Sequence, residues 1–122
     1  MEDARKHLDE GVRLYNLGRY EEAIKEYDKV LAIDPNDEEA HNNKGVALSN
    51  LGRYEEAIKE FDKALAIDPN DKVAHFNKGL ALHYLGRYEE AIKEYDKALA
   101  VDPNYGPARN NKESALKELK KI

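Results

Sequence analysis

The ten-residue segment LGRYEEAIKE occurs three times in this chain, beginning at Leu17, Leu51 and Leu85, so consecutive copies are 34 residues apart. A fixed period of this length is typical of stacked helical hairpins, because one hairpin cannot bury its apolar face without a neighbour. The period defines repeat units at 4–37, 38–71 and 72–105, and the second and third units differ at nine positions. Residues 106–122 begin a fourth unit that lacks a second helix. The period therefore predicts a stack of hairpins.

The composition narrows the class of protein and its partners. Residues 1–122 are short enough for one domain, with 37% charged residues, no cysteine and no long apolar run that would predict a signal or a membrane span. We therefore expect a soluble, cytoplasmic chain. The net charge of −5 argues against nucleic acid as a partner, since that affinity comes mainly from lysine and arginine contacts with phosphates.

Each full unit carries the pattern of two amphipathic helices. In the second unit, Gly52 stands where the first helix is expected to end, because glycine readily adopts the left-handed conformation of a helix C-terminus. Pro69 follows the second helix and cannot continue it, and Asp71 can cap the start of the next one. Two helices per unit follow from this pattern.

Gly45 lies in the middle of a predicted helix, where glycine costs about 1 kcal/mol relative to alanine. Such a residue needs a compensating close contact, and we expect the small side chain of Ala57 in the partner helix to provide it. Gly11 with Ala23 and Gly79 with Ala91 repeat the arrangement. The unfinished fourth unit has Glu113 at the glycine position, which favours a capping helix with a polar outer face over 106–122.

These positions resemble the tetratricopeptide repeat pattern, which is W-x₂-L-G-x₂-Y, then A-x₃-F, then P. The resemblance covers nearly the whole chain. It implies an all-α fold, a right-handed α-solenoid of three helix-turn-helix repeats with a C-terminal capping helix. Histidine replaces the pattern's tryptophan, a charged residue its first leucine, and leucine its tyrosine. The corresponding residues of the second unit are His41, Lys44, Gly45, Leu48, Ala57, Phe61 and Pro69.

Five of the nine differences between the second and third units fall on one face of the predicted first helix. In the family that the chain resembles, this face lines a concave groove that binds peptide segments. The alternative is an exposed face that varies without function. The candidate peptide-binding residues are Leu8, Asp9, Val12, Tyr15, Asn42, Asn43, Val46, Asn50, Val73, Phe76, Asn77, Leu80, His83, Tyr84, Asn110 and Asn111, and Asn16, Ser49 and Ser114 lie beside them.

Asn43, Asn77 and Asn111 recur once per unit. An asparagine amide both donates and accepts, which suits a peptide main chain, and some members of the family hold extended peptides with such a ladder. The alternative is a set of solvated side chains. Other members bind terminal carboxylates through lysines, an arginine and asparagines. In this chain those places fall on Leu8, Val12, Asn43, Val73 and Asn77, so a terminal carboxylate would lack cationic partners.

His7, His41 and His75 also recur once per unit. Equivalent helices pack about 8–10 Å apart, too far for three imidazoles to share one metal ion, so we expect a packing role and no metal or other cofactor. The sequence has no cysteine and no glycine-rich phosphate loop, and its carboxylates are spread among lysines. We therefore expect no enzymatic activity.

Three hypotheses for function remain at this point. The first is a protein-protein interaction module that binds an extended peptide in the groove. The second is an idealised or engineered scaffold without a ligand of its own, since the near-identical units resemble regular archaeal or bacterial arrays as well as consensus designs. The third is end-to-end self-association, although the expected state is a monomer that binds neither membrane nor nucleic acid.

Overall fold

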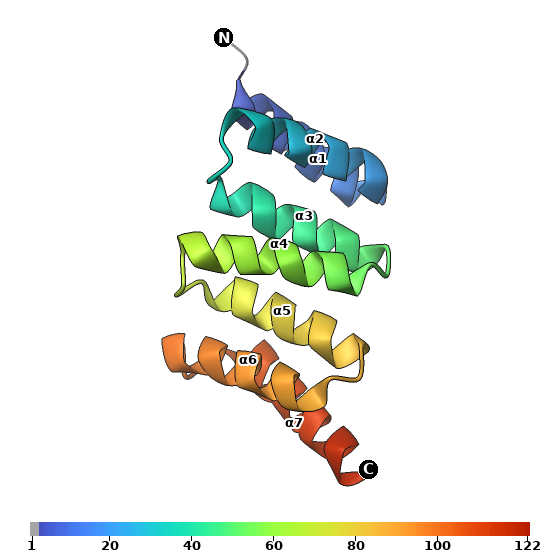
Figure 1. Ribbon diagram of the computed structural model, residues 1–122, viewed down its shortest axis with the longest axis vertical. Helices are drawn as coiled ribbons and strands as arrows, with labels where there is room; N and C mark the ends of the chain where they lie inside the picture. The colour runs from blue at the N-terminus through green and yellow to red at the C-terminus, as the bar shows by residue number, and fades with distance from the viewer. Residues whose placement is uncertain (1–2) are drawn as a thin grey trace.

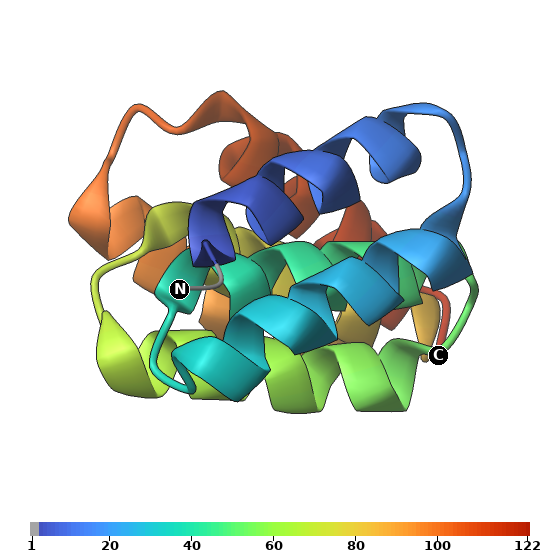
Figure 2. The same ribbon diagram turned by 90° about the horizontal axis from the view of Figure 1, so that it is seen from above.

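The computed structural model describes residues 3–122, which form a stack of helices without strands. The hairpins follow one another along the long axis, so the two ends of the chain lie at opposite ends of the stack (Figure 1). Seen from above, the hairpins lie over one another (Figure 2). No helix in the described part of the chain is long and apolar enough to cross a membrane. The helices are α1 (Ala4–Asn16), α2 (Tyr20–Ile33), α3 (Glu38–Asn50), α4 (Tyr54–Ile67), α5 (Lys72–Tyr84), α6 (Tyr88–Val101) and α7 (Gly106–Lys120).

The helix ends follow the predicted turn chemistry. Gly52 has a φ of +77°, in the left-handed region, and the Arg53 N–H donates to the carbonyl oxygen of Leu48 at 2.9 Å. This pair of features closes α3 in a Schellman motif, and Gly18 and Gly86 occupy the equivalent positions. At the start of α5, the Asp71 carboxylate accepts hydrogen bonds from the first-turn N–H groups. The all-α repeat architecture predicted from the period is confirmed.

The mid-helix glycines face aromatic rings, and the expected contact with alanine is wrong. A Cβ atom at Gly45 would lie 2.5 Å from Cε1 of Phe61, and Gly11 and Gly79 face Tyr27 and Tyr95 in the same way. These rings are almost completely buried between the two helices of each unit. The aromatic ring therefore occupies the space that a side chain at the glycine would need.

Lysine ion pairs join successive units at the position where the family pattern has leucine. The ammonium group of Lys44 lies 2.7 Å from a carboxylate oxygen of Asp28 in the preceding unit, and Lys78 makes the same contact with Asp62. Lys112 of α7 pairs with Asp96 at 2.6 Å. The lysine at this position in α3, α5 and α7 therefore forms an ion pair with the second helix of the preceding unit.

The recurring histidines pair with glutamates and do not converge on one another. In the second unit, His41 is buried, and its Nδ1 lies 2.9 Å from Oε1 of Glu60 while its Nε2 lies 2.8 Å from the carbonyl oxygen of Pro35. His75 repeats both contacts with Glu94 and Pro69. Each ring therefore ties its helix to the partner helix and to the preceding turn, which is a packing role both within and between units.

The last helix covers the end of the third hairpin. Ala108 and Ala115 are fully buried and belong to the same apolar cluster as Tyr95 and Ala98 of α6. The opposite side of α7 exposes mainly polar residues, although Leu116 is 39% exposed. This arrangement matches a terminal helix that is apolar on its inner face and largely polar outside.

Three carboxylates meet at the junction between the second and third units. Glu38, Asp68 and Asp71 each place an oxygen within 4.8 Å of the others. A hydrogen bond with Asp71, burial, and the neighbouring negative charges raise the pKa of Glu38 to about 8. At the next junction the equivalent residues are Lys72, Asp102 and Tyr105, and there the Lys72 ammonium lies 2.7 Å from Asp102 and 5.0 Å from the centre of the Tyr105 ring. The junction between the second and third units therefore has three carboxylates close together, whereas the next junction has a lysine at one of the equivalent positions.

We predict that Gly45→Ala lowers the free energy of unfolding, although alanine favours the helix by about 1 kcal/mol. The new Cβ would collide with the buried ring of Phe61, and overpacking of this kind typically costs about 1–3 kcal/mol. Urea denaturation measures the change. Glu113→Ala is the matched control, because Glu113 is exposed at the same position of α7, and no partner helix follows α7 within residues 3–122. A further Phe61→Leu substitution should restore part of the loss, and a Gly45→Ala variant as stable as the parent would remove the close-contact explanation.

We also predict that the free energy of unfolding falls as the pH rises from about 4.5 to about 8. The pKa of Glu38 in the folded chain is about 8, against a reference value of 4.5, so in this window the folded chain keeps a proton that the unfolded chain has lost. Glu38→Gln should flatten the profile and stabilise the protein at pH 8 by about 1 kcal/mol or more. Urea denaturation at several pH values tests this expectation.

Glu89→Gln, a substitution of an exposed residue on α6, is the control for the change in charge. The buried carboxylate of Glu94 acts outside the window. Burial alone would raise the pKa of Glu94, but the hydrogen bond from His75 and the charges of Lys78 and Lys97 lower it, so its contribution is lost only as the pH falls below about 4.5. A parent protein with equal stability at pH 5 and pH 8 would contradict the assignment of the proton to Glu38.

Candidate functional site

Two pockets lie along the first helices of the units and share the side chain of Val46. The first pocket, between the first and second units, has a volume of about 260 Å³, and the second, between the second and third units, has a volume of about 340 Å³. We call the two together the groove. The first pocket is lined by Val12, Tyr15, Asn16, Tyr27, Asn43 and Val46, and the second by Val46, Ser49, Asn50, Tyr54, Phe61, Asn77, Leu80, Ala81 and Tyr84.

The two pockets are built from equivalent positions of successive units. Each has an aromatic ring from the second helix at its base, a pair of aliphatic side chains, and asparagines from the first helices. The groove therefore repeats with the period of the sequence. Residues that correspond after a shift of 34 positions are Val12 and Val46, Tyr15 and Ser49, Asn16 and Asn50, Tyr27 and Phe61, Asn43 and Asn77, and Val46 and Leu80.

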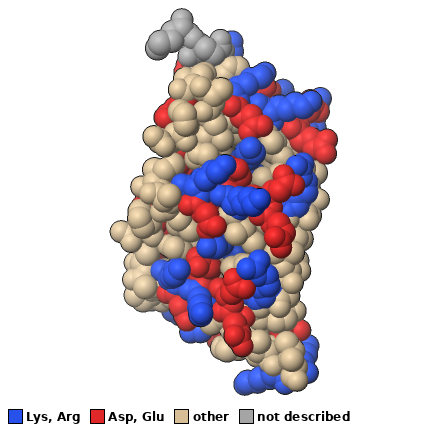
Figure 3. Space-filling view, viewed as in Figure 1, with Lys and Arg blue, Asp and Glu red and all other residues tan. Residues whose placement is uncertain are grey.

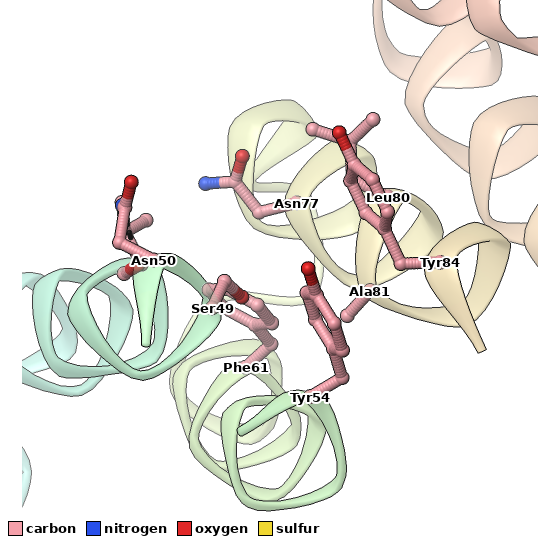
Figure 4. A pocket seen from close by; sticks show the side chains of 9 residues that line it. Ser49, Asn50, Tyr54, Phe61, Asn77, Leu80, Ala81 and Tyr84 are labelled. Carbon is pink, nitrogen blue, oxygen red and sulfur yellow. Dashed lines mark hydrogen bonds between the residues drawn. The ribbon is translucent and has the colours of Figure 1, made fainter. Parts of the chain in front are cut away.

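Three helices supply the second pocket. Asn50 and Asn77 project from α3 and α5, while Tyr54 and Phe61 rise from α4 (Figure 4). The rings of Tyr54 and Tyr84 stack with centroids 5.2 Å apart and planes only 7° from parallel. Tyr84 remains 70% exposed despite this contact. One side of the pocket is therefore an accessible aromatic wall.

The groove is lined entirely by uncharged side chains in a chain with 37% charged residues. Burial, with smaller effects from Tyr15 and Glu39, raises the pKa of Tyr27 to about 12, so this hydroxyl also stays neutral around pH 7. Basic and acidic side chains are interspersed on the face of the molecule shown in Figure 3. The ion pairs between units use many of these charges away from the groove.

The asparagines of the groove differ in how far their amides are already engaged. Asn50 donates through Nδ2 to the Tyr15 hydroxyl and to the carbonyl oxygen of Val46, both at 2.9 Å. Within residues 3–122, no hydrogen bond engages the side-chain amides of Asn43 and Asn77, and each lines one pocket. Two equivalent amides, one per pocket, therefore face a potential ligand.

Half of the candidate residues from the sequence line these pockets. Asn16 and Ser49, which lie beside the candidates in the sequence, do so as well. The structure thus brings together aliphatic, aromatic and amide side chains from α1, α3 and α5. The candidates that line a pocket are Val12, Tyr15, Asn43, Val46, Asn50, Asn77, Leu80 and Tyr84.

Leu8 is a correction to the candidate set. It is 4% exposed and belongs to the apolar core of the first unit with Tyr27 and Ala40, so it cannot present its side chain to a ligand. Phe76 packs against the rings of Tyr95 and Tyr105 at the junction with α7, outside both pockets. Large apolar side chains at this position turn toward the core because a hydrophobic neighbour is available there.

The remaining candidates lie outside the two pockets. His83 is half-buried, with Nδ1 3.3 Å from the Tyr95 hydroxyl and its ring edge-on to Tyr88. Asp9 pairs with Arg5, Val73 is exposed, and the buried Oδ1 of Asn42 has no hydrogen-bond partner in the described part of the chain. Asn110 and Asn111 lie on α7, where Nδ2 of Asn111 donates to the carbonyl oxygen of Pro107 at 2.8 Å.

The second helices also contribute side chains to the groove, which the sequence pattern did not predict. Tyr54 begins α4 directly after the tight turn, which places it beside the C-terminal end of α3. Phe61 and Tyr27 reach the groove because glycine leaves a gap in the first helix opposite each ring. The aromatic residue repeated opposite each glycine was the available sign of this arrangement.

One group in the described part of the chain has the spacing of potential metal ligands, the three carboxylates Glu38, Asp68 and Asp71. The raised pKa of Glu38 means that its protonated carboxyl group can donate to Asp71. Clustered acidic groups without further ligands do not identify an ion, and we assign none to them.

The fold and groove can now be compared with known proteins. The first tetratricopeptide domain of Spaghetti (RPAP3), bound to the HSP90 peptide SRMEEVD, aligns with a TM-score of 0.93 and 27% identity over 96% of this chain and 93% of that one. The first such domain of human RPAP3 aligns equally well, at 27% identity over 97% of this chain and 93% of the other. YrrB, described as a protein of this type with an unusual peptide-binding site, aligns at 0.87 and 27% identity over 93% of this chain and 58% of its own.

A search of curated protein sequences found no match. Family models give a clear result, however. A model described as tetratricopeptide repeat matches residues 8–72, more than half of the chain, and a second with the same description matches residues 73–105. Together with the paired helices of each unit and the structural matches, this result shows that the chain belongs to the tetratricopeptide repeat family.

Proposed function

We propose that the chain is a protein-interaction module, without catalytic activity, that binds an extended peptide segment of another protein along the groove. The observation that carries this proposal is the pair of unengaged amides, Asn43 and Asn77, each lining one of two equivalent pockets. An amide of this kind offers one acceptor and two donors to the main chain of a peptide. The apolar walls beside it can bury a peptide side chain.

The structural relatives support the same class of ligand. Spaghetti (RPAP3) is bound to an HSP90 peptide, and YrrB is described as having a peptide-binding site. A second domain of human RPAP3, 25% identical to this chain, is in complex with the HSP70 peptide SGPTIEEVD. Peptide binding by the shared fold makes this chain's groove the natural place for a ligand, and the groove's own residues decide which peptide it selects.

We predict that Asn43→Ala combined with Asn77→Ala weakens the binding of a selected peptide by roughly 5- to 150-fold. Each lost neutral hydrogen bond is worth about 0.5–1.5 kcal/mol, and the two sites lie in separate pockets. Stability should change little, because within residues 3–122 neither amide holds a hydrogen bond that the fold would lose. Isothermal titration with a peptide taken from a display selection measures the effect.

Lys59→Ala and Lys93→Ala serve as controls on the exposed side of the second helices. Both should bind the peptide as the parent does. If the lysine substitutions weaken binding and the asparagine substitutions do not, the ligand occupies the opposite face and the proposed function of the groove is wrong.

A further inference from the structure

We infer that the groove binds an uncharged peptide segment in the polyproline II conformation, and this inference rests on the proposed function. The segment has two apolar side chains that are three residues apart. One apolar side chain enters each pocket, and the asparagines hydrogen-bond the main chain between them. The uncharged lining of the groove, the apolar side chains of the two pockets and the spacing between the pockets support this class of peptide.

The lining discriminates against charged ligands. A charged side chain that enters either pocket loses part of its hydration and meets no opposite charge in the lining, which is unfavourable. An acidic peptide such as SRMEEVD, seen with Spaghetti (RPAP3), therefore does not fit this groove.

Each pocket offers an apolar subsite of its own. The first is lined by Val12, Val46 and the ring of Tyr27, and the second by Val46, Leu80 and the ring of Phe61. Burial of an aliphatic side chain against such surfaces is favourable, because it removes apolar area from water. Two anchors, one per unit, follow from the equivalence of the pockets.

The spacing of the pockets sets the spacing of the anchors. Cα atoms of α1 and α3, and of α3 and α5, come within 8 Å of each other, so the first helices are in direct contact. Helices in contact have axes about 8–10 Å apart, so we expect equivalent pockets on successive first helices to repeat at about that interval. Three residues of polyproline II span about 9.3 Å and bring side chains back to the same face. In an extended strand, two residues span only about 6.8 Å and four span about 13.6 Å.

The main chain of polyproline II is also suited to the asparagines. This conformation has no internal hydrogen bonds, so its N–H and C=O groups are available to a partner. The amides of Asn43 and Asn77 recur with the pockets and can bond these groups at each unit. The Tyr54 and Tyr84 rings add an aromatic wall of the kind on which proline-rich segments dock.

Four capped peptides test the inference by fluorescence polarisation. GLPALPG has leucines three residues apart, while GLPLAPG and GLPAPLG have the same composition with leucines two and four apart. GLPAEPG keeps the first leucine and places glutamate at the second anchor position. We expect the first peptide to bind the parent protein at least about tenfold more tightly than the other three and than SRMEEVD. Equal affinities, or a preference for another spacing or for an acidic peptide, would overturn the inference.

Substitutions in the protein locate the anchors. Val12→Asp and Leu80→Asp place a carboxylate in the first and second pocket, and each should weaken GLPALPG about tenfold or more. Val101→Asp, on an exposed part of α6, is the matched control and should bind as the parent does. Circular dichroism melts confirm that the variants fold, and retention of GLPALPG binding by both folded pocket variants contradicts the assignment.

The test separates this inference from the proposed function. If GLPALPG fails while a display-selected peptide binds and depends on Asn43 and Asn77, the groove binds peptides but the inferred class is wrong. If no peptide from the display selection binds in a way that depends on these asparagines, the proposed function fails as well.

Discussion

The contact between a glycine and an aromatic ring across each hairpin is the constraint on which the rest of the structure depends. Phe61 is fully buried, and its ring fills the space that a side chain at Gly45 would occupy. This contact brings the two helices of the unit close together. The same ring also lines the second pocket. The residue that sets the helix spacing is thus also part of the groove.

The distribution of charge follows from the same architecture. Lys44 and Lys78 stand where the family pattern has an apolar residue, and each reaches a carboxylate of the preceding unit. Glu60 and Glu94 are buried beside histidines within their own units. Many charges therefore serve the contacts between helices, and the groove keeps a neutral lining although the chain as a whole is highly charged.

The architecture could be predicted from the sequence because its determinants are local. Gly52 marks a left-handed residue, Asp71 caps a helix, and the period of 34 residues places the glycine in every unit and an aspartate cap before α1, α3 and α5. The partner of Gly45 could not be identified in this way. Helical spacing shows which residues share a face, but Ala57 and Phe61 share one, and only the three-dimensional packing shows which lies opposite the glycine.

The same limit explains the mixed outcome for the site. Val46 and Leu80 occupy equivalent positions and both line the groove, whereas Leu8 and Phe76 share a position whose side chains turn into apolar contacts. A position on the first helix is therefore not enough to place a side chain in the groove. Size, polarity and the neighbours at each junction decide the direction.

The three carboxylates between the second and third units make the electrostatics of this interface differ from those of the next, although the repeats are nearly identical in sequence. In a one-dimensional description, the stability of a repeat protein is a sum of terms for each unit and for each interface. Glu38, Asp68 and Asp71 weaken one interface term at neutral pH, whereas Lys72 and Asp102 strengthen the next. The interface between the second and third units therefore carries an electrostatic penalty that the next interface lacks. The larger of the two groove pockets spans this same interface, so the part of the groove with the most room lies beside the clustered carboxylates.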